Sequence, residues 1–89
     1  MRAVVTVTGT DRRGIIATVS GYLSEKKINV EDISQTILGG QFAMIMVVDI
    51  SACEEDLAAL SVGLEELGKE IGMSVRIQHE DIFNAMHVV

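Results

Sequence analysis

The chain has 89 residues, of which 48% are hydrophobic and 22% are charged. A chain of this length allows one domain, and its composition is that of an ordinary globular protein, which excludes intrinsic disorder and a fibrous structure. Thirteen acidic residues against seven basic residues give a net charge of −6, and 3% of the residues are aromatic, so we expect no nucleic-acid partner.

The first predicted element is a strand over residues 2–8, which is short, rich in β-branched residues and followed by a turn-prone sequence, Gly9-Thr10-Asp11. A helix is predicted from Gly14 to Lys27, because apolar residues recur there at spacings of three and four. Its last turn is expected to hold Lys26 and Lys27, which suit the negative end of the helix dipole. Asp11 is expected to cap the first turn or to favour its positive end.

Two strands joined by a tight turn are predicted next. Residues 29–38 alternate imperfectly between apolar and polar types, which indicates a partly exposed strand suited to the edge of a sheet. Gly39 and Gly40 tolerate a positive φ, so a hairpin is expected there. Residues 41–50 are apolar on both faces of the strand, a pattern that is typical of the centre of a sheet.

The clearest periodicity in the chain predicts a helix over residues 57–71. Gly63 and Gly68 are each expected to weaken this helix by about 1 kcal/mol. Gly72 is expected to end it in a left-handed cap. The predicted apolar face consists of Leu57, Leu60, Leu64, Leu67 and Ile71.

Residues 73–80 alternate with a period of two, which predicts a fourth strand with His79 on its apolar face. The tail, residues 81–89, has room for one helical turn from Asp81, in which Phe83 and Met86 would seek apolar cover.

The predicted order is strand, helix, strand, strand, helix, strand. It predicts an α+β fold, a ferredoxin-like βαββαβ sandwich in which a four-stranded antiparallel sheet carries two helices on one face. We expect residues 1–89 to form one domain, with 81–89 as its tail. Because two helices cover one face of the sheet, some of Ala43, Ile45 and Val47 are expected to face solvent or another subunit. Dimerisation is therefore expected.

The residues offer little support for catalysis. His79, His87 and Cys53 lack the short paired spacing of a zinc or redox site, and we expect no metal and no cofactor. No serine has an evident histidine and carboxylate partner, so we predict no catalytic residue and no enzymatic activity. The lone cysteine, the lack of a signal-peptide pattern and a longest apolar stretch of six residues lead us to expect a cytoplasmic protein without a membrane anchor.

One segment has a physical reason to bind a small molecule, the junction between the first strand and the first helix, residues 9–16. Unpaired N–H groups at a helix start attract a carboxylate, and Gly14 permits close approach. Asp11 could accept from an ammonium group, and Asn29 offers both a donor and an acceptor. The alternative is purely structural: Asp11 caps the helix, Gly14 packs it against the sheet and Asn29 shapes a turn. The residues alone favour that alternative.

Residues 7–35 resemble the opening half of ACT domains. The family pattern Asp-x-x-Gly-apolar after the first strand corresponds to Asp11, Gly14 and Ile15, and the later small-Asn-apolar step corresponds to Asn29. The element order and length extend the resemblance over nearly the whole chain, and the tail is similar to that of small stand-alone ACT proteins. Similar openings occur in formyltetrahydrofolate deformylases and glycine-cleavage regulators.

The resemblance implies a regulatory, allosteric module that binds an amino acid or similar small molecule where two domains meet. Side-by-side pairing in the family joins two four-stranded sheets into one of eight strands. We therefore expect a homodimeric sensor in which the amides of Gly14 and Ile15 hold the ligand's carboxylate, and Asp11 or Asn29 holds its amine.

Two other functions stay open. The chain could be a protein-interaction subunit that docks on a metabolic enzyme or regulator without a ligand. It could also be an enzyme of the same fold, such as an acylphosphatase, with Arg12 and Arg13 as candidate phosphate ligands. The glycine-rich cradle of such an enzyme is absent, so this function ranks last.

Overall fold

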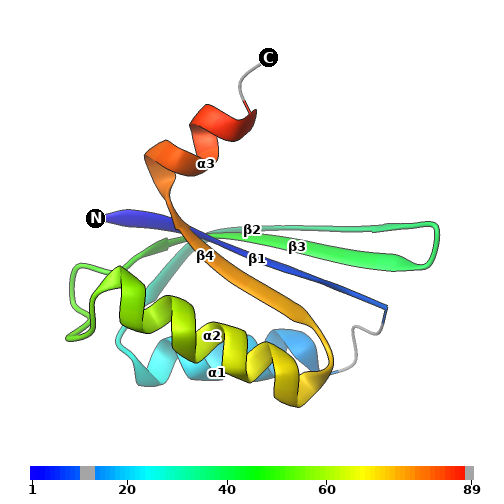
Figure 1. Ribbon diagram of the computed structural model, residues 1–89, viewed down its shortest axis with the longest axis horizontal. Coiled ribbons are helices and arrows are strands. Elements are labelled where there is room, and N and C mark those ends of the chain that lie inside the picture. The colour runs from blue at the N-terminus through cyan, green and yellow to red at the C-terminus, as the bar shows by residue number, and fades with distance from the viewer. Residues whose placement is uncertain (11–13, 88–89) are drawn as a thin grey trace.

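The computed structural model describes residues 1–10 and 14–87 (Figure 1). The elements in chain order are β1 (Arg2–Gly9), α1 (Ile15–Glu25), β2 (Asn29–Leu38), β3 (Gln41–Asp49), α2 (Leu57–Ile71), β4 (Ser74–His79) and α3 (Glu80–His87). The predicted order of six elements is confirmed, and a third helix follows them.

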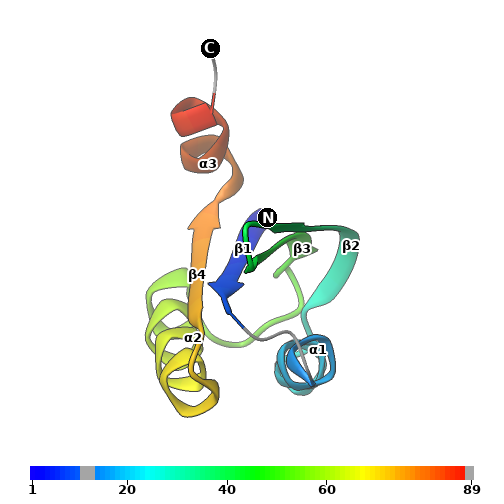
Figure 2. The same cartoon turned by 90° about the vertical axis from the view of Figure 1, so that its right-hand side faces the viewer.

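The four strands form one sheet in the order β2-β3-β1-β4, with antiparallel neighbours throughout. Both α1 and α2 lie against the same face of this sheet (Figure 2). This arrangement is the ferredoxin-like sandwich predicted from the sequence. The two central strands are β3 and β1, and β2 and β4 form the edges.

The core lies between the sheet and the two helices. Alternate residues of the central strands point toward the helices, as the pairing of Val5 with Met46 and of Val7 with Met44 illustrates. All four side chains are completely buried, so these methionines fill the core. The helices contribute the buried side chains Val19, Leu23, Leu60 and Leu64.

The opposite face of β3 is apolar but lacks the cover of α1 and α2. Ile45 retains 37% of its accessible surface, and Ala43 and Val47 are half-buried. The prediction that residues of this set face away from the helices is confirmed.

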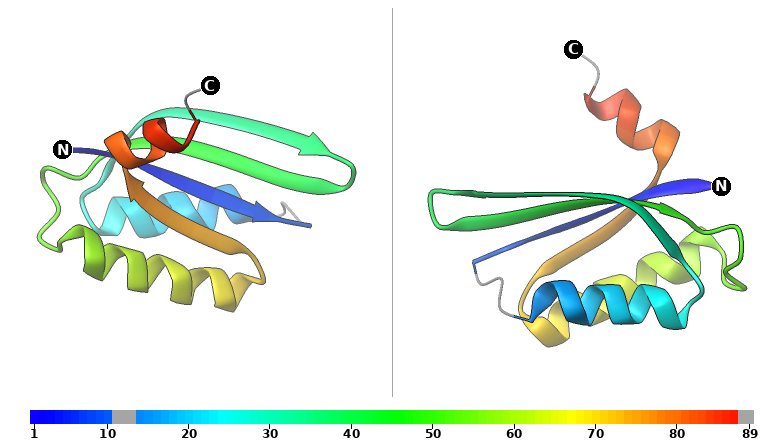
Figure 3. Two further views of the ribbon diagram at one scale, coloured as in Figure 1. Left: turned by 45° about the horizontal axis from the view of Figure 1, so that its top comes forward. Right: turned by 180° about the vertical axis from the view of Figure 1, so that it is seen from behind.

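The helix α3 differs from the predicted single turn. It spans eight residues, begins directly after β4, and rises on the side of the sheet opposite to α1 and α2 (Figure 3). The N–H of Asp81 donates to Nδ1 of His79 at 3.0 Å, which links the strand end to the helix start. Phe83 is half-buried, whereas Ile82 and Met86 are exposed, so the expected cover for Met86 is not found.

The end of α1 also departs from expectation. The helix stops at Glu25, and the two lysines predicted in its last turn lie just beyond it. Lys27 adopts a positive φ of 60°, which reverses the chain toward β2. Lys26 forms an ion pair with Glu55, Nζ to Oε2 at 2.6 Å, so a side chain rather than the helix dipole is its partner.

Gly68 is a requirement of packing rather than a weakness of α2. A Cβ at this position would lie 2.6 Å from the carbonyl oxygen of Met73 and 3.1 Å from the nitrogen of Val75. The absence of a side chain thus lets α2 approach the backbone of β4. The cap residue Gly72 has a φ of 72°, and the predicted left-handed cap is confirmed.

We expect Gly68→Ala to lower the free energy of unfolding by about 1–3 kcal/mol, because the methyl group meets backbone atoms that cannot rotate away. Gly21→Ala is the matched control, since a Cβ at Gly21, also within a helix, meets no atom of the described part of the chain within 4 Å. That variant should be more stable than wild type by up to about 1 kcal/mol. Urea denaturation measures both, and a neutral Gly68→Ala would contradict the close approach.

Candidate ligand-binding site

Gly14 immediately precedes α1 and has a left-handed backbone conformation, with a φ of 70°. A Cβ at this position would meet no atom of residues 1–10 and 14–87 within 4 Å. The left-handed backbone conformation is therefore what requires glycine at position 14. The structural alternative, in which Gly14 packs the helix against the sheet, does not explain this glycine.

The first main-chain hydrogen bond of α1 runs from the N–H of Thr18 to the carbonyl oxygen of Gly14, at 3.0 Å. The N–H groups of Ile15 and Ile16 precede this bond, and no oxygen of the described residues accepts a hydrogen bond from them. The side chain of Ile15 is buried in the core, which holds this end of the helix in place. Asp11 lies outside the described residues.

Asn29, the other predicted ligand contact, begins β2 and is exposed. It pairs with Asp49, and Asp49 pairs with Arg2 at the start of β1. Gly14, in contrast, follows the far end of β1. The two predicted contacts thus lie at opposite ends of α1, an 11-residue helix about 16 Å long. One chain does not bring them together.

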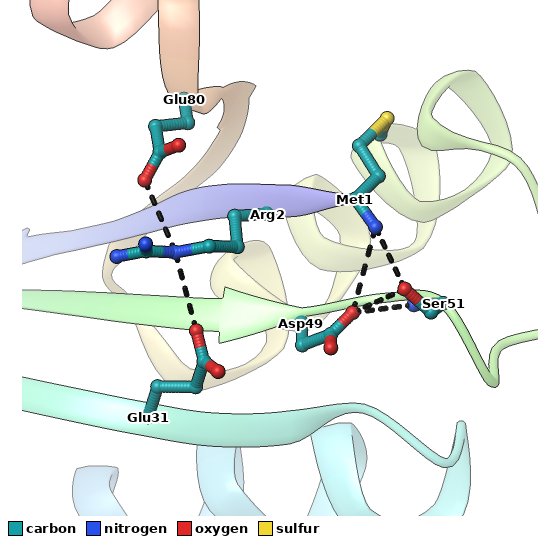
Figure 4. A network of polar contacts seen from close by, with 6 residues as sticks. All are labelled: Met1, Arg2, Glu31, Asp49, Ser51 and Glu80. Carbon is teal, nitrogen blue, oxygen red and sulfur yellow. Dashed lines mark hydrogen bonds and ion pairs between the residues drawn. The ribbon is translucent and has the colours of Figure 1, made fainter.

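A network of polar contacts lies at the start of β1 and the end of β3 (Figure 4), the end of the sheet where Asn29 pairs with Asp49. The N-terminal ammonium of Met1 donates to Oγ of Ser51 at 2.7 Å and lies 3.6 Å from Oδ1 of Asp49. The hydroxyl and the N–H of Ser51 both donate to Asp49, and these bonds hold the pKa of the Asp49 carboxyl below its usual value. The network anchors the beginning of β1 to the end of β3.

Arg2 connects the same end of β2 to α3. Its Nε lies 3.2 Å from Oε1 of Glu31 and 3.1 Å from Oε2 of Glu80. Glu31 lies at an irregularity of the pairing between β2 and β3. Sequence reasoning missed this cluster, because its members are far apart in the chain and show no spacing pattern.

The match to known families decides what the chain is. Residues 2–78 match the family model of the ACT domain. This chain belongs to the ACT domain family. The resemblance predicted from Asp11, Gly14, Ile15 and Asn29 is thereby confirmed at the level of the family.

Relatives of this ACT domain extend over nearly its full length. The UPF0237 protein MJ1558 of Methanocaldococcus jannaschii is 54% identical over 86 residues, which cover 97% of this chain and 96% of the relative. The structure of an ACT domain protein from Streptococcus pneumoniae has a TM-score of 0.84 and 40% identity, with 93% of each chain covered.

Larger proteins contain similar domains. A formyltetrahydrofolate deformylase from Pseudomonas syringae pv. tomato has a TM-score of 0.78 and 25% identity, covering 88% of this chain and 27% of that chain. A regulatory subunit of aspartate kinase from Thermus thermophilus has a TM-score of 0.63 and 29% identity, covering 86% of this chain and 50% of that chain. A putative glycine cleavage system transcriptional repressor shares the fold. Its structure has a TM-score of 0.73 and 23% identity, covering 86% of this chain and 44% of that chain.

Two exposed isoleucines lie on the β2 edge of the ACT domain, and a third lies at the start of α1. Ile33 and Ile37 of β2 pair with Met46 and Phe42, so they lie on the face of the sheet that carries the helices. They nevertheless retain 41% and 55% of their surface, and Ile16 of α1 retains 38%. Exposed side chains of this size at a sheet edge suit contact with another protein surface.

A hollow of about 330 Å³ lies beyond the end of α1, lined by residues 25–27 and 53–55. It contains the Lys26–Glu55 ion pair, and the hydrogen bond to Glu55 raises the pKa of Lys26. Nζ of Lys26 also lies 5.6 Å from the centre of the Tyr22 ring, and burial raises the pKa of Tyr22. The charges of Lys26 and Glu55 neutralise each other, so this hollow offers no unpaired charge from this pair to bind a small ion.

Within residues 1–10 and 14–87, no group of three or more histidine, cysteine or acidic side chains could hold a metal ion. In the same part of the chain, no helix has the length and apolar character needed to cross a membrane.

Proposed function

We propose that this ACT domain is a non-enzymatic regulatory module that binds an amino acid, or a related small zwitterion, between two copies of the chain. The regulatory role has support in the family, because the similar aspartate kinase structure is a regulatory subunit. One observation carries the proposal: Ile15 and Asn29, its two candidate contacts, lie at opposite ends of α1.

A second copy can bring these two ends together. If the β2 edges of two copies pair antiparallel about a two-fold axis, the α1 helices also run in opposite directions. The start of α1 in one copy then lies beside the end of α1 in the other. Two equivalent sites result, each with the N–H groups of Ile15 and Ile16 from one copy and Asn29 from the second.

The chemistry of such a site suits a zwitterion. N–H groups at the positive end of a helix bind a carboxylate, and here two of them lack an acceptor among the described residues. The Asn29 side-chain oxygen can accept from an ammonium group, and Asp11 remains a predicted second acceptor. The ligand thus connects the two copies, which makes it a stabiliser of the dimer.

The surface at the β2 edge supports the same dimer. Pairing of two β2 edges would satisfy their free main-chain groups and produce a sheet of eight strands. It would also remove Ile33, Ile37 and Ile16 from water. A cytoplasmic location accords with the single cysteine, because Cys53 cannot form a disulfide within its own chain.

Calorimetry and thermal unfolding with the twenty amino acids and with folate-linked metabolites test the proposal. A ligand at about a hundred times its Kd should stabilise the protein by about 2.7 kcal/mol and raise Tm by several degrees. The shift should be lost in Asn29→Ala and retained in Asn84→Ala, an exposed asparagine of α3. Absence of heat and of any shift with every compound would contradict the sensing role and favour a protein-interaction subunit.

A further inference from the structure

The free edge of β4 is flanked by hollows over its whole length. β4 is the last strand of the sheet, and in the described part of the chain it pairs with β1 only. A hollow of about 260 Å³ is lined by residues 73–76, and one of about 480 Å³ is lined by residues 77–79. Every residue of β4 therefore lines one of the two hollows.

The opposite wall of both hollows is one flank of α2. From Ala58 onward the residues that form it recur every three or four positions, so they lie on one side of the helix: Ala58, Ser61, Glu65 and Lys69, with Leu57 next to Ala58 at the helix start. The other flank of α2, with Gly63 and Glu66, faces Tyr22 of α1. The hollows thus lie outside the sheet edge, on the side of α2 that is turned away from α1. Figure 2 shows α2 near β4 and α1 near the opposite edge of the sheet.

The two ends of this edge differ in chemistry. Lys69 and Arg76 line the first hollow, and neither forms an ion pair with an acidic residue of the described chain, although Glu65 lines the same hollow. Two unpaired cations in a protein of net charge −6 favour an acidic partner group. The second hollow is mainly apolar, with Leu57, Ile77 and the exposed Ile82 in its lining.

A second copy of the chain is a poor occupant for this edge. The proposed function already pairs the β2 edge with a second copy, and the present inference rests on that pairing. If β4 also paired with its own copy, each sheet would continue at both edges and the assembly would not close. The β4 edge is therefore left for a segment of a different protein.

We infer that the β4 edge binds an extended segment of another protein by strand addition, with an acidic side chain of the segment at Lys69 and Arg76 and an apolar one beside Ile77 and Ile82. Main-chain hydrogen bonds to the free strand edge supply affinity in this mode of recognition, and the side-chain hollows supply selectivity. The residues that line the two hollows along β4, 73–76 and 77–79, are centred three to four positions apart, or roughly 12 Å.

Two blocked synthetic peptides of roughly ten residues test the inference. Each peptide consists of threonine and serine, with one glutamate and one leucine four positions apart. The glutamate precedes the leucine in one peptide and follows it in the other, because the added strand can run parallel or antiparallel to β4. Binding is followed by NMR and amide hydrogen exchange of residues 74–79. One peptide should protect the alternate amides of β4 that face the free edge, and N-methylation of its own alternate amides should raise Kd about tenfold or more.

Charge-reversal variants supply the matched comparison. Lys69→Glu or Arg76→Glu should raise Kd for the peptide about tenfold, whereas Lys27→Glu, an exposed lysine beyond α1, should leave it unchanged. The inference is overturned if the exchange rates of the β4 amides do not change at millimolar peptide. It is also overturned if Lys27→Glu raises Kd as much as Lys69→Glu and Arg76→Glu do. A third contrary result is protection of the β4 amides that increases with protein concentration in the absence of peptide. Ligand binding and dimerisation are measured on the same samples. If they persist while the peptide fails, the strand-addition inference falls and the proposed function stands.

Discussion

Gly14→Val and Asn29→Ala proteins, each unable to bind the ligand alone, are expected to regain about a quarter of the wild-type sites when they are refolded together in equal amounts. Valine disfavours the left-handed backbone of Gly14, whose φ is 70°, so this variant should displace the N–H groups at the start of α1. The second variant removes the side-chain amide at the start of β2.

The expected fraction follows from the symmetry of the dimer. Random pairing gives about half of the dimers as mixed pairs. In a mixed pair, one site receives the start of α1 from the Asn29→Ala chain and Asn29 from the Gly14→Val chain, so it is intact. The other site carries both defects. A site built within one chain could not be repaired in this way.

Calorimetry with the ligand identified in the screen measures the number of sites. The control mixture combines Gly14→Val with the double variant Gly14→Val/Asn29→Ala, in which every site receives the altered helix start. A regained signal in this control, or none in the test mixture of folded proteins, would show that the site does not cross the dimer interface.

The element order of this chain was predictable because each element carries a simple local signal. The spacing from Leu57 to Ile71 identifies α2, and the two glycines between β2 and β3 identify the hairpin. The apolar character of both faces of β3 correctly placed that strand inside the sheet. Periodicity and turn residues act over a few positions, so the sequence displays them directly.

Features that depend on contacts between distant residues were not predictable in the same way. Gly68 looked like a defect of α2 because the main chain of Met73, which a Cβ would meet, lies beyond the end of this helix, just before β4. Lys26 looked like a helix-dipole residue because Glu55 lies 29 positions later in the chain. The length of α3 was missed because its start is linked to His79, a residue assigned to the preceding strand.

The candidate site falls between these two cases. Its residue types follow a family pattern, so Gly14, Ile15 and Asn29 could be named from the sequence. Their separation along α1 depends on where β1 ends and where β2 begins, which the register of the sheet decides. The proposed site therefore needs a second copy because its predicted contacts lie at opposite ends of α1, and this reason is independent of the dimerisation expected from the family resemblance.

Ile37→Glu is expected to raise the dimer dissociation constant at least about a hundredfold. Ile37 lies on the β2 edge and is 55% exposed in the single chain, so the substitution should cost the folded monomer little. In the proposed dimer the two-fold axis buries one of these glutamates at each end of the β2 contact, where each must lose its hydration without a cationic partner. A loss of about 1.4 kcal/mol for each copy corresponds to a hundredfold change.

Ile45→Glu is the matched control, because Ile45 is a similarly exposed isoleucine, at 37%, on the opposite face of the sheet. Sedimentation across a concentration series should show the Ile37 variant as monomer where wild type and the Ile45 variant are dimers. If the two variants dissociate alike, general destabilisation explains the effect. If only Ile45→Glu dissociates, the copies meet through the outer face of the sheet, and the ligand site cannot be shared between α1 of one copy and Asn29 of the other.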